Sequence, residues 1–307
     1  MMSIEAILKE AGFTVSEACY SRPSCFDYAA RKNEKTIFVK IQSDIGNLSP
    51  KDSQELKAIS EFLSATSILV GEKTRDRLLE DDTIYSRYEV LAFTPKTLES
   101  IMLHKIYPLI QASPGGYYVE IDGETIRRRR QELGLSAGEM AKMIGISRRT
   151  LYGYERGMAK ASVTAAYNLM STLGIPVAKA VDIFENPQRK RKCFFLATAK
   201  RAIAGNRILQ RILRKFSRYR VTAVKKAPFD FVISVPKDKM RILGGVARSK
   251  EPELNRRVDE ILSVARVVQA HPILVTDGLD SPRKDIDCIS SDEFSMIRNL
   301  EDLIVGI

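Results

Sequence analysis

The chain has 307 residues, of which 44% are hydrophobic, and its formal net charge is +11 at pH 7. This length predicts about two or three domains with folded cores. The chain has no apolar run long enough to cross a membrane, and its first residues lack the pattern of a secretory signal. Its four cysteines show no CxxC spacing, which argues against a structural zinc site and fits a reducing cytoplasm. We therefore expect a cytoplasmic protein with no metal ion and no cofactor.

Strands and helices alternate in the first third of the chain. This alternation predicts an α/β module over residues 1–112. Its expected elements are a helix at 4–11, strands at 14–18, around Phe26-Asp27-Tyr28-Ala29, and at 36–41, a helix at 52–63, a strand at 68–70, and a strand and helix within 88–102.

The segment Leu135–Gly157 has the pattern of two short helices joined by a tight turn. Ser136 and Glu139 have the spacing of a capping box, and Gly145 is placed to end the first helix. Ser147 is placed to cap the second helix. An all-helical domain of five short helices is expected here, with helices at 123–133, 137–144, 148–155, 163–173 and 176–184.

This pattern resembles the lambda-repressor/Cro-like (xenobiotic-response-element type) helix-turn-helix domain, and we assign that domain to residues 119–186. The residues that carry the resemblance are Arg130, the SAGEMA run at 136–141, the GIS turn at 145–147, Leu151 and the YERG end at 154–157. The resemblance implies that Arg130 and Glu155 form a structural pair between the first and third helices. One departure is Ala137-Gly138, because the family often has a phosphate-binding Gln just after the capping Ser.

In this family the start of the helix at 148–155 enters the major groove of DNA. Arg148 and Arg149 are expected to contact base edges there, since a bidentate Arg–guanine contact contributes about 1–3 kcal/mol of discrimination. The alternative is that both arginines contact only phosphate. The remaining candidates are Thr150 and Tyr152 for bases, and Ser136 and Ser147 for phosphates.

The positive charge is concentrated after this domain. Residues 186–229 contain fourteen Lys or Arg and no Asp or Glu. Residues 187–202 are expected to be a basic linker, and the residues that follow have helical periodicity. One helical face is apolar, and a second face carries candidate phosphate contacts at Arg207, Arg211, Arg214 and Arg218. The alternatives are a solvated face or a surface for an acidic partner.

The motif Phe26-Asp27-Tyr28-Ala29 recurs as Phe229-Asp230-Phe231-Val232, at an offset of 203 residues between the two aspartates. The order of helices and strands around it recurs as well, which predicts a second copy of the α/β module over residues 203–307. The expected fold is therefore mixed, with an all-α domain between two duplicated α/β modules.

The repeated module resembles the Holliday-junction-resolvase and restriction-endonuclease (PD-(D/E)xK) fold. That resemblance implies an Asp, followed on the next strand by an acid and a Lys, around a divalent cation. The first copy has Asp27 and Lys40 but has Phe38 at the acid position. The second copy keeps Asp230 and has Ile242, Leu243 and Gly244 where the acid and the Lys would fall. We expect both copies to be degenerate, nuclease-like and without catalytic residues.

The overall layout is similar to the archaeal family of helix-turn-helix-type transcriptional regulatory proteins. The resemblance implies a sequence-specific regulator that binds double-stranded DNA as a homodimer and has no membrane partner, and it leaves a small-molecule or protein effector open. One alternative is a metal-dependent endonuclease that uses the first module, with Glu55 as a displaced metal ligand. The other is a non-specific architectural nucleic-acid-binding protein that uses the basic segment.

Overall fold

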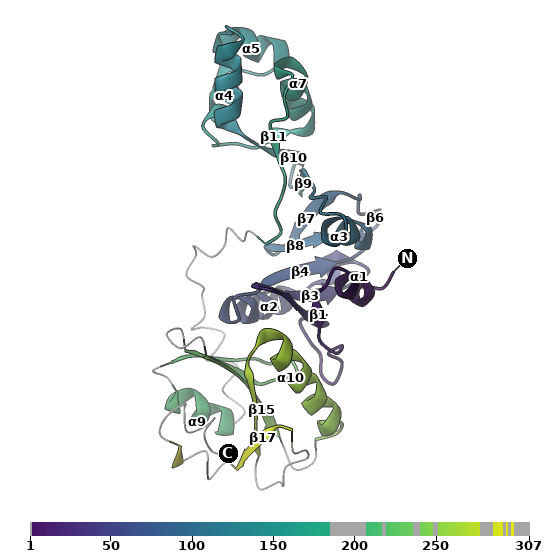
Figure 1. The fold of residues 1–307 in the computed structure, drawn as a ribbon, viewed down its shortest axis with the longest axis vertical. Coiled ribbons are helices and arrows are strands. Elements are labelled where there is room, and N and C mark those ends of the chain that lie inside the picture. Colours follow the sequence, from purple (N-terminus) through teal and green to yellow (C-terminus); the bar gives the residue numbers. More distant parts are fainter. Residues whose placement is uncertain are drawn as a thin grey trace. The chain divides into compact units, whose positions relative to one another are not determined.

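The computed structural model describes residues 2–184, 207–216, 219–235, 240–247, 251–276, 285–290, 293 and 296–297. The predicted basic linker and Arg218 lie outside these ranges. The chain packs into two compact units (Figure 1). The module unit comprises Met1–Gln42, Asn47–Leu69 and Asn186–Ile307, and the helix-turn-helix unit comprises Ser43–Gly46 and Val70–Glu185.

The first copy of the α/β module forms the N-terminal part of the module unit. Serine caps begin both of its helices, at Ser3 and Ser49, and Pro50 takes the first position of the second helix. The first three strands pair antiparallel in chain order. The elements are α1 (Ile4–Glu10), β1 (Thr14–Val15), β2 (Tyr28–Lys32), β3 (Lys35–Ile41), α2 (Pro50–Phe62) and β4 (Thr66–Val70).

The second copy has the same order of elements. Its first three strands pair antiparallel, and the next two pair parallel, so the five-stranded sheet follows chain order. The repeat also predicts a strand and helix within residues 286–303 of this copy, and most of that helix lies outside the described residues. The elements are α9 (Arg207–Lys215), β13 (Arg220–Ala223), β14 (Phe231–Val235), β15 (Met240–Ala247), α10 (Leu254–Val268), β16 (His271–Thr276) and β17 (Asp287–Ser290).

The helix-turn-helix unit begins with a set of strands. The strand β8 pairs antiparallel with β7, β7 pairs parallel with β9, and β9 forms a hairpin with β10. The turn of that hairpin contains Gly115 and Gly116, both with positive φ. The elements are η1 (Ile45–Asn47), β5 (Lys73–Thr74), β6 (Arg77–Leu78), β7 (Thr83–Arg87), β8 (Val90–Phe93), α3 (Pro95–Met102), β9 (Ile110–Ser113) and β10 (Gly116–Ile121).

Four helices follow in this unit, at the places where capping residues predict them. They surround a core that includes Met140, Ile144, Leu151 and Leu169. The helices are α4 (Gly123–Glu132), α5 (Ala137–Ile144), α6 (Arg148–Glu155) and α7 (Val163–Leu173), and the short strand β11 (Ala161–Ser162) precedes α7.

The fifth predicted helix, at 176–184, does not form. The segment instead contains β12 (Ala178–Lys179), which pairs antiparallel with β10. The Asp122 N–H donates to the Val177 carbonyl at 2.8 Å, and the Val177 side chain is buried in the core. The edge of β10 leaves backbone groups that need partners, and this extended segment supplies them. The domain therefore combines four helices with a small sheet.

In the part of the chain that the structure describes, no helix combines the length and the apolar character that a membrane span requires.

Candidate nucleic-acid interface and nuclease-like motif

Local hydrogen bonds fix the beginnings of α5 and α6, and a glycine ends α5. The Ser136 hydroxyl accepts the Glu139 N–H at 3.1 Å, and the Glu139 carboxylate accepts the Ser136 N–H at 2.8 Å, which completes a capping box. Gly145 ends α5 with a φ of 76°, in the left-handed region that favours glycine. The Ser147 hydroxyl then accepts the Thr150 N–H at 3.0 Å and begins α6. Ser136 and Ser147 are both exposed, so each hydroxyl also faces solvent.

The helix α6 has one buried face and one exposed face. Leu151 and Tyr154 pack into the core. The exposed face carries Arg148, Arg149 and Tyr152, and Tyr152 is 50% exposed. Thr150 is half-buried, and its hydroxyl lies 2.9 Å from that of Ser147. The four side chains expected to reach bases therefore all lie on α6, although Thr150 is partly engaged by the cap.

Arg148 and Arg149 differ in their surroundings. A Cβ added to Gly138 would lie 2.6 Å from Nη2 of Arg148, so the guanidinium lies over the beginning of α5. A larger residue at position 138 would require this guanidinium to shift. The family often has a phosphate-binding Gln next to this position, and here a cation occupies the neighbourhood. This placement favours a phosphate contact for Arg148, because the N-terminus of a helix also attracts anions.

Arg130 and Glu155 form a bidentate pair between α4 and α6. The guanidinium Nε and Nη2 atoms donate to the two carboxylate oxygens at 2.6 and 3.2 Å, and Nη1 donates to the Leu135 carbonyl at 2.8 Å. The hydrogen bonds to Glu155 raise the pKa of Arg130. Both side chains are largely buried, and the pair links α4 to α6.

The helix α9 is strongly amphipathic, and its apolar side enters the core of the second copy. Leu209, Ile212 and Phe216 are buried there. Arg207, Arg211 and Arg214 are exposed on the other side, and within the described residues no acidic side chain pairs with them. Arg218 is outside the described residues.

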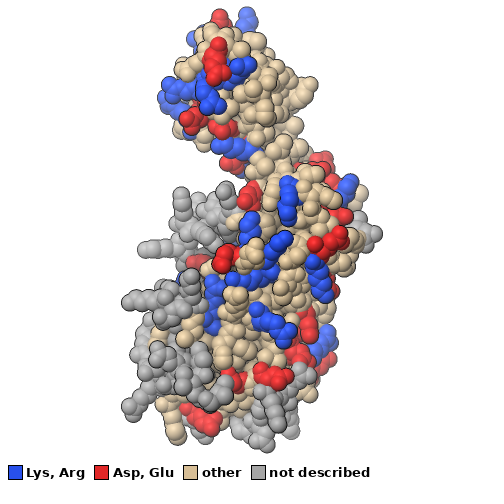
Figure 2. Space-filling view, in the orientation of Figure 1, with Lys and Arg blue, Asp and Glu red and all other residues tan. Residues whose placement is uncertain are grey.

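In the view of Figure 2, Lys and Arg side chains gather on the left side of the helix-turn-helix domain, with Asp and Glu side chains between them. Together with the exposed arginines of α6, these cations give this unit a surface that suits a phosphate backbone.

In the first copy, the motif aspartate is fully engaged by the protein. Asp27 Oδ1 lies 2.9 Å from Lys40 Nζ, and Oδ2 accepts the Ile41 N–H at 2.6 Å. The expected acid position holds Phe38, which is fully buried, with its ring centroid 4.7 Å from that of Phe26. Asp27 and Lys40 are thus brought together, and an aromatic core replaces the second carboxylate.

The second copy holds its aspartate in the same backbone position. The Asp27 N–H donates to the Val39 carbonyl and the Asp230 N–H donates to the Gly244 carbonyl, each at 2.8 Å. The offset of 203 at the aspartates therefore becomes 205 on the next strand. This register corrects the sequence alignment: Lys40 corresponds to Gly245.

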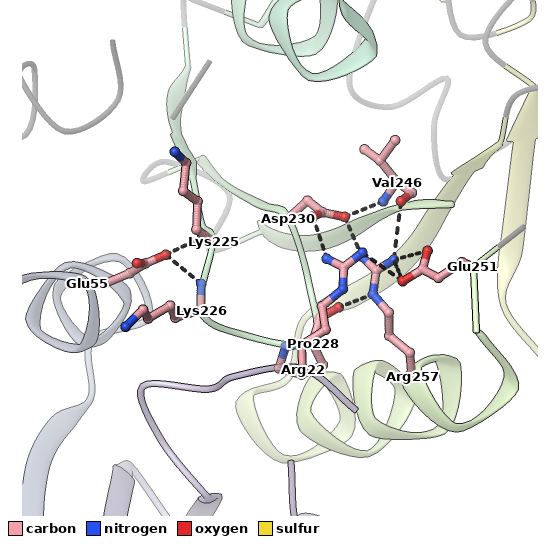
Figure 3. Close-up of polar contacts among 9 residues, drawn as sticks. All are labelled: Arg22, Glu55, Lys225, Lys226, Pro228, Asp230, Val246, Glu251 and Arg257. Carbon is pink, nitrogen blue, oxygen red and sulfur yellow. Dashed lines mark hydrogen bonds and ion pairs between the residues drawn. The ribbon is translucent and has the colours of Figure 1, made fainter. Parts of the chain in front are cut away.

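A different cation replaces Lys40 in the second copy. The Arg257 side chain enters from α10 and pairs with Asp230, and a Cβ on Gly245 would lie 3.4 Å from its Nη2 (Figure 3). Arg22, from the first copy, donates to Asp230 Oδ1 at 2.8 Å. Glu251 lies between the two guanidinium groups and accepts from both.

Neither motif fits a divalent cation. Glu55, the candidate displaced ligand, accepts the backbone N–H groups of Lys225 and Lys226 from the second copy. Each oxygen of Asp27 and Asp230 already has a donor or cation, and the nearby side chains add positive charge. Across the described residues, no group of three or more His, Cys, Asp or Glu side chains could hold a metal ion. The donor set that Mg²⁺ prefers, several carboxylate or carbonyl oxygens, is therefore not present at either aspartate.

Sequence reasoning did not identify Arg22, Glu251, Arg257 or Glu260 as partners in this region. Each looks like an ordinary surface charge in its own segment. One feature of the sequence could have indicated Glu260: it occupies the same position in the second copy as Glu55 does in the first. This correspondence appears only when the copies are aligned with the offset of 205.

The sequence matches the PD-(D/E)XK superfamily domain over residues 1–108 and the Helix-turn-helix family over residues 126–179. Among solved structures, the SinR protein/SinI protein complex is 18% identical, covers 31% of this chain and 90% of that chain, and has a TM-score of 0.17.

The chain is also similar to archaeal proteins named "Putative HTH-type transcriptional regulatory protein". The relative from Methanococcoides burtonii is 32% identical over 97% of this chain and 92% of its own length. The relative from Methanosarcina acetivorans is 32% identical over 89% and 84%, and that from Pyrococcus furiosus is 28% identical over 98% and 94%. These similarities extend well beyond the helix-turn-helix segment and include both α/β copies. The chain therefore belongs to this archaeal family of HTH-type transcriptional regulatory proteins.

Proposed function

We propose that this protein regulates transcription by binding double-stranded DNA at specific sequences, with α6 in the major groove. The observation that carries the proposal is the start of α6: two exposed arginines and an exposed tyrosine stand on a helix whose capping turn is fixed. Such a helix can present side chains to base edges without first having to be ordered.

Within this surface the side chains have different proposed roles. Arg149 and Tyr152 are the main candidates for base contacts, with Thr150 beside them. Arg148 contacts either a base or, as its position over Gly138 favours, a phosphate. Ser136 and Ser147 lie at the starts of α5 and α6, where exposed hydroxyls can donate to phosphate oxygens.

The proposal includes a homodimer of the chain. Helix-turn-helix proteins commonly read two half-sites about one helical turn apart, and each chain of this protein supplies one α6. The exposed arginines of α9 would add phosphate contacts in each chain, outside the sequence-reading surface.

The proposal includes no catalysis, and the composition of the two aspartate sites supports this. We expect no cleavage of DNA in the presence of Mg²⁺ or Mn²⁺. Divalent-ion-dependent cleavage that disappears in Asp27→Ala would support the endonuclease alternative instead.

The decisive experiment is selection of bound fragments from genomic DNA at about 150 mM salt, followed by footprinting. We expect an enriched motif with two related half-sites. Arg149→Ala should relax the base preference at one position of each half-site, whereas Arg77→Ala, which removes an exposed arginine of the β6 strand, should leave it unchanged. If no motif is enriched, or if scrambled DNA binds equally well, the architectural alternative replaces this proposal.

A further inference from the structure

The two copies of the α/β module contact each other through a pair of matching glutamates. Glu260, on α10, accepts the backbone N–H groups of Tyr20 and Ser21 at 2.9 and 2.8 Å. Glu55, on α2, accepts those of Lys225 and Lys226, the latter at 2.9 Å (Figure 3). In each case the glutamate belongs to the long helix of one copy, and the two N–H groups belong to the loop before the motif aspartate of the other copy.

These two contacts are the same contact made twice. Glu55 and Glu260 are 205 residues apart, and so are Tyr20 and Lys225, and Ser21 and Lys226. The start of each loop is held in the same way. In the first copy the N–H of Cys19 donates to the Asp27 carbonyl at 3.0 Å, and in the second copy the N–H of Val224 donates to the Asp230 carbonyl at 2.7 Å. Reciprocal use of one surface by two copies defines an isologous, two-fold interface.

The elements and rings around the glutamates follow the same symmetry. The helix α10 of the second copy packs against β2 of the first. The equivalent helix of the first copy, α2, packs against β14, which is the counterpart of β2. Phe26 and Phe229, which precede the two aspartates, are both fully buried, with ring centroids 6.3 Å apart. Equivalent residues meet each other only near a two-fold axis, so the axis passes close to this ring pair.

We propose that each chain contains an internal pseudo-dimer of its two degenerate nuclease-like modules, in which Glu55 and Glu260 clamp the loop beside the other copy's motif aspartate. Two ion pairs between the copies support this pairing: the motif aspartate Asp230 holds Arg22 of the first copy, and Asp52 on α2 pairs with Lys226 of the second. Because the pairing surface is filled within one chain, two chains would have to associate through a different surface.

The clamps make a prediction that crosses from one copy to the other. Each clamp can be tested in the full chain by hydrogen exchange with peptide-resolved mass spectrometry. Glu260→Ala should accelerate exchange in the segment 17–26 of the first copy by about 10- to 100-fold, since charge-assisted hydrogen bonds are lost there. Glu55→Ala should do the same in the segment 222–230 of the second copy. Glu10→Gln, at an exposed position of α1, should change neither segment.

Glu55→Gln and Glu260→Gln keep the shape and one acceptor, so they test the clamps if an alanine variant does not fold. Each should give a smaller acceleration in the same, opposite copy. Acceleration confined to the copy that carries the substitution, or equal acceleration throughout the chain, would overturn the proposal. The ion pair between Asp230 and Arg22 has its own readout: Mg²⁺ or Mn²⁺ should not raise the melting temperature, and a saturable rise that Asp230→Asn abolishes would refute it.

These results are independent of the proposed regulatory function. A chain that selects no DNA motif can still show the cross-copy exchange pattern, and a chain without the clamps can still bind a motif through α6.

Discussion

Asp27 and Asp230 show how the same backbone position can be neutralised in two ways. Asp27 takes its cation from the next strand, where Lys40 is two residues from the buried Phe38. In the second copy Gly245 stands where the first copy has Lys40, so Asp230 pairs instead with Arg257, which lies on α10. A Cβ on Gly245 would lie 2.9 Å from Cδ1 of Ile261 and of Leu274 and 3.4 Å from Nη2 of Arg257, so these three side chains together leave little room there. The two copies therefore share the backbone position of the aspartate, and they differ in the element that supplies the balancing cation: a strand in the first copy and a helix in the second.

The importance of Arg257 can be measured at this single residue. It is 1% exposed and contacts Asp230, Glu251 and the Pro228 carbonyl, so its removal leaves carboxylates without their partner in a buried place. We expect Arg257→Ala to lower the free energy of unfolding of the module unit by about 3 kcal/mol in urea denaturation. Arg266→Ala, at an exposed position of the same helix, should lower it by less than about 1 kcal/mol. Equal effects of the two variants would mean that Arg257 is not the anchor.

At the level of helices and strands, the sequence is most informative where the determinants are local. Ser136, Ser147 and Ser162 each accept an N–H three residues ahead, which is why α5, α6 and α7 begin where the capping pattern predicts. The prediction of a helix at 176–184 is wrong. This segment pairs with β10, which lies far away in the sequence, so no local pattern indicates the pairing. The contacts of Glu55 and Arg257 are also long-range, and no local pattern distinguishes these residues from surface charges.

The approach of α4 to α6 depends on Gly123. A Cβ there would lie 2.2 Å from the Tyr154 carbonyl oxygen. We expect Gly123→Ala to push the helices apart, lower the stability of the helix-turn-helix unit by about 1–3 kcal/mol, and weaken DNA binding. Thermal unfolding and DNA titration measure the two effects.

A glycine inside α6 provides the matched control. A Cβ on Gly153 would meet its nearest neighbour at 3.9 Å, so Gly153→Ala should stabilise the helix by about 0.5–1 kcal/mol. Destabilisation by both substitutions would show that space at Gly123 is not the cause.

On the scale of the whole molecule, the contacts between the two α/β copies and the candidate DNA-binding surfaces involve different charged residues. Asp230 takes part in the contact between the two copies, Asp27 pairs with Lys40 of its own copy, and the candidate DNA-binding cations lie on α6 and α9. The two systems should respond to different solution conditions: pH for the contacts between the copies, and salt for the cationic surfaces.

Acid should weaken the contact between the two copies through Asp52. Burial alone would raise the pKa of Asp52, but hydrogen bonds from Lys226 and Ser49 lower it below its ordinary value of 3.8. A carboxylate with a lower pKa in the folded state adds stability above its unfolded pKa and loses that stability as the pH falls through the folded pKa. We therefore expect the urea concentration at the unfolding midpoint of the module unit to decrease as the pH is lowered below about 4. Asp52→Asn should be less stable at pH 7 and less sensitive in this acid window, whereas Asp76→Asn, at an exposed turn, should behave like the wild type.

Salt should separate the contribution of α9 from that of α6. Each phosphate contact on duplex DNA contributes about 0.9 to the slope of log affinity against log salt concentration. If Arg207, Arg211 and Arg214 each contact a phosphate, replacing all three with alanine reduces that slope by about 3 and weakens matched and scrambled sequences alike. Alanine preserves the helix, and the apolar face of α9 is untouched. A control that replaces Lys9, Lys51 and Arg77 removes the same charge at other exposed positions. If both triple variants reduce the slope equally, the effect comes from net charge, and α9 does not track the DNA backbone.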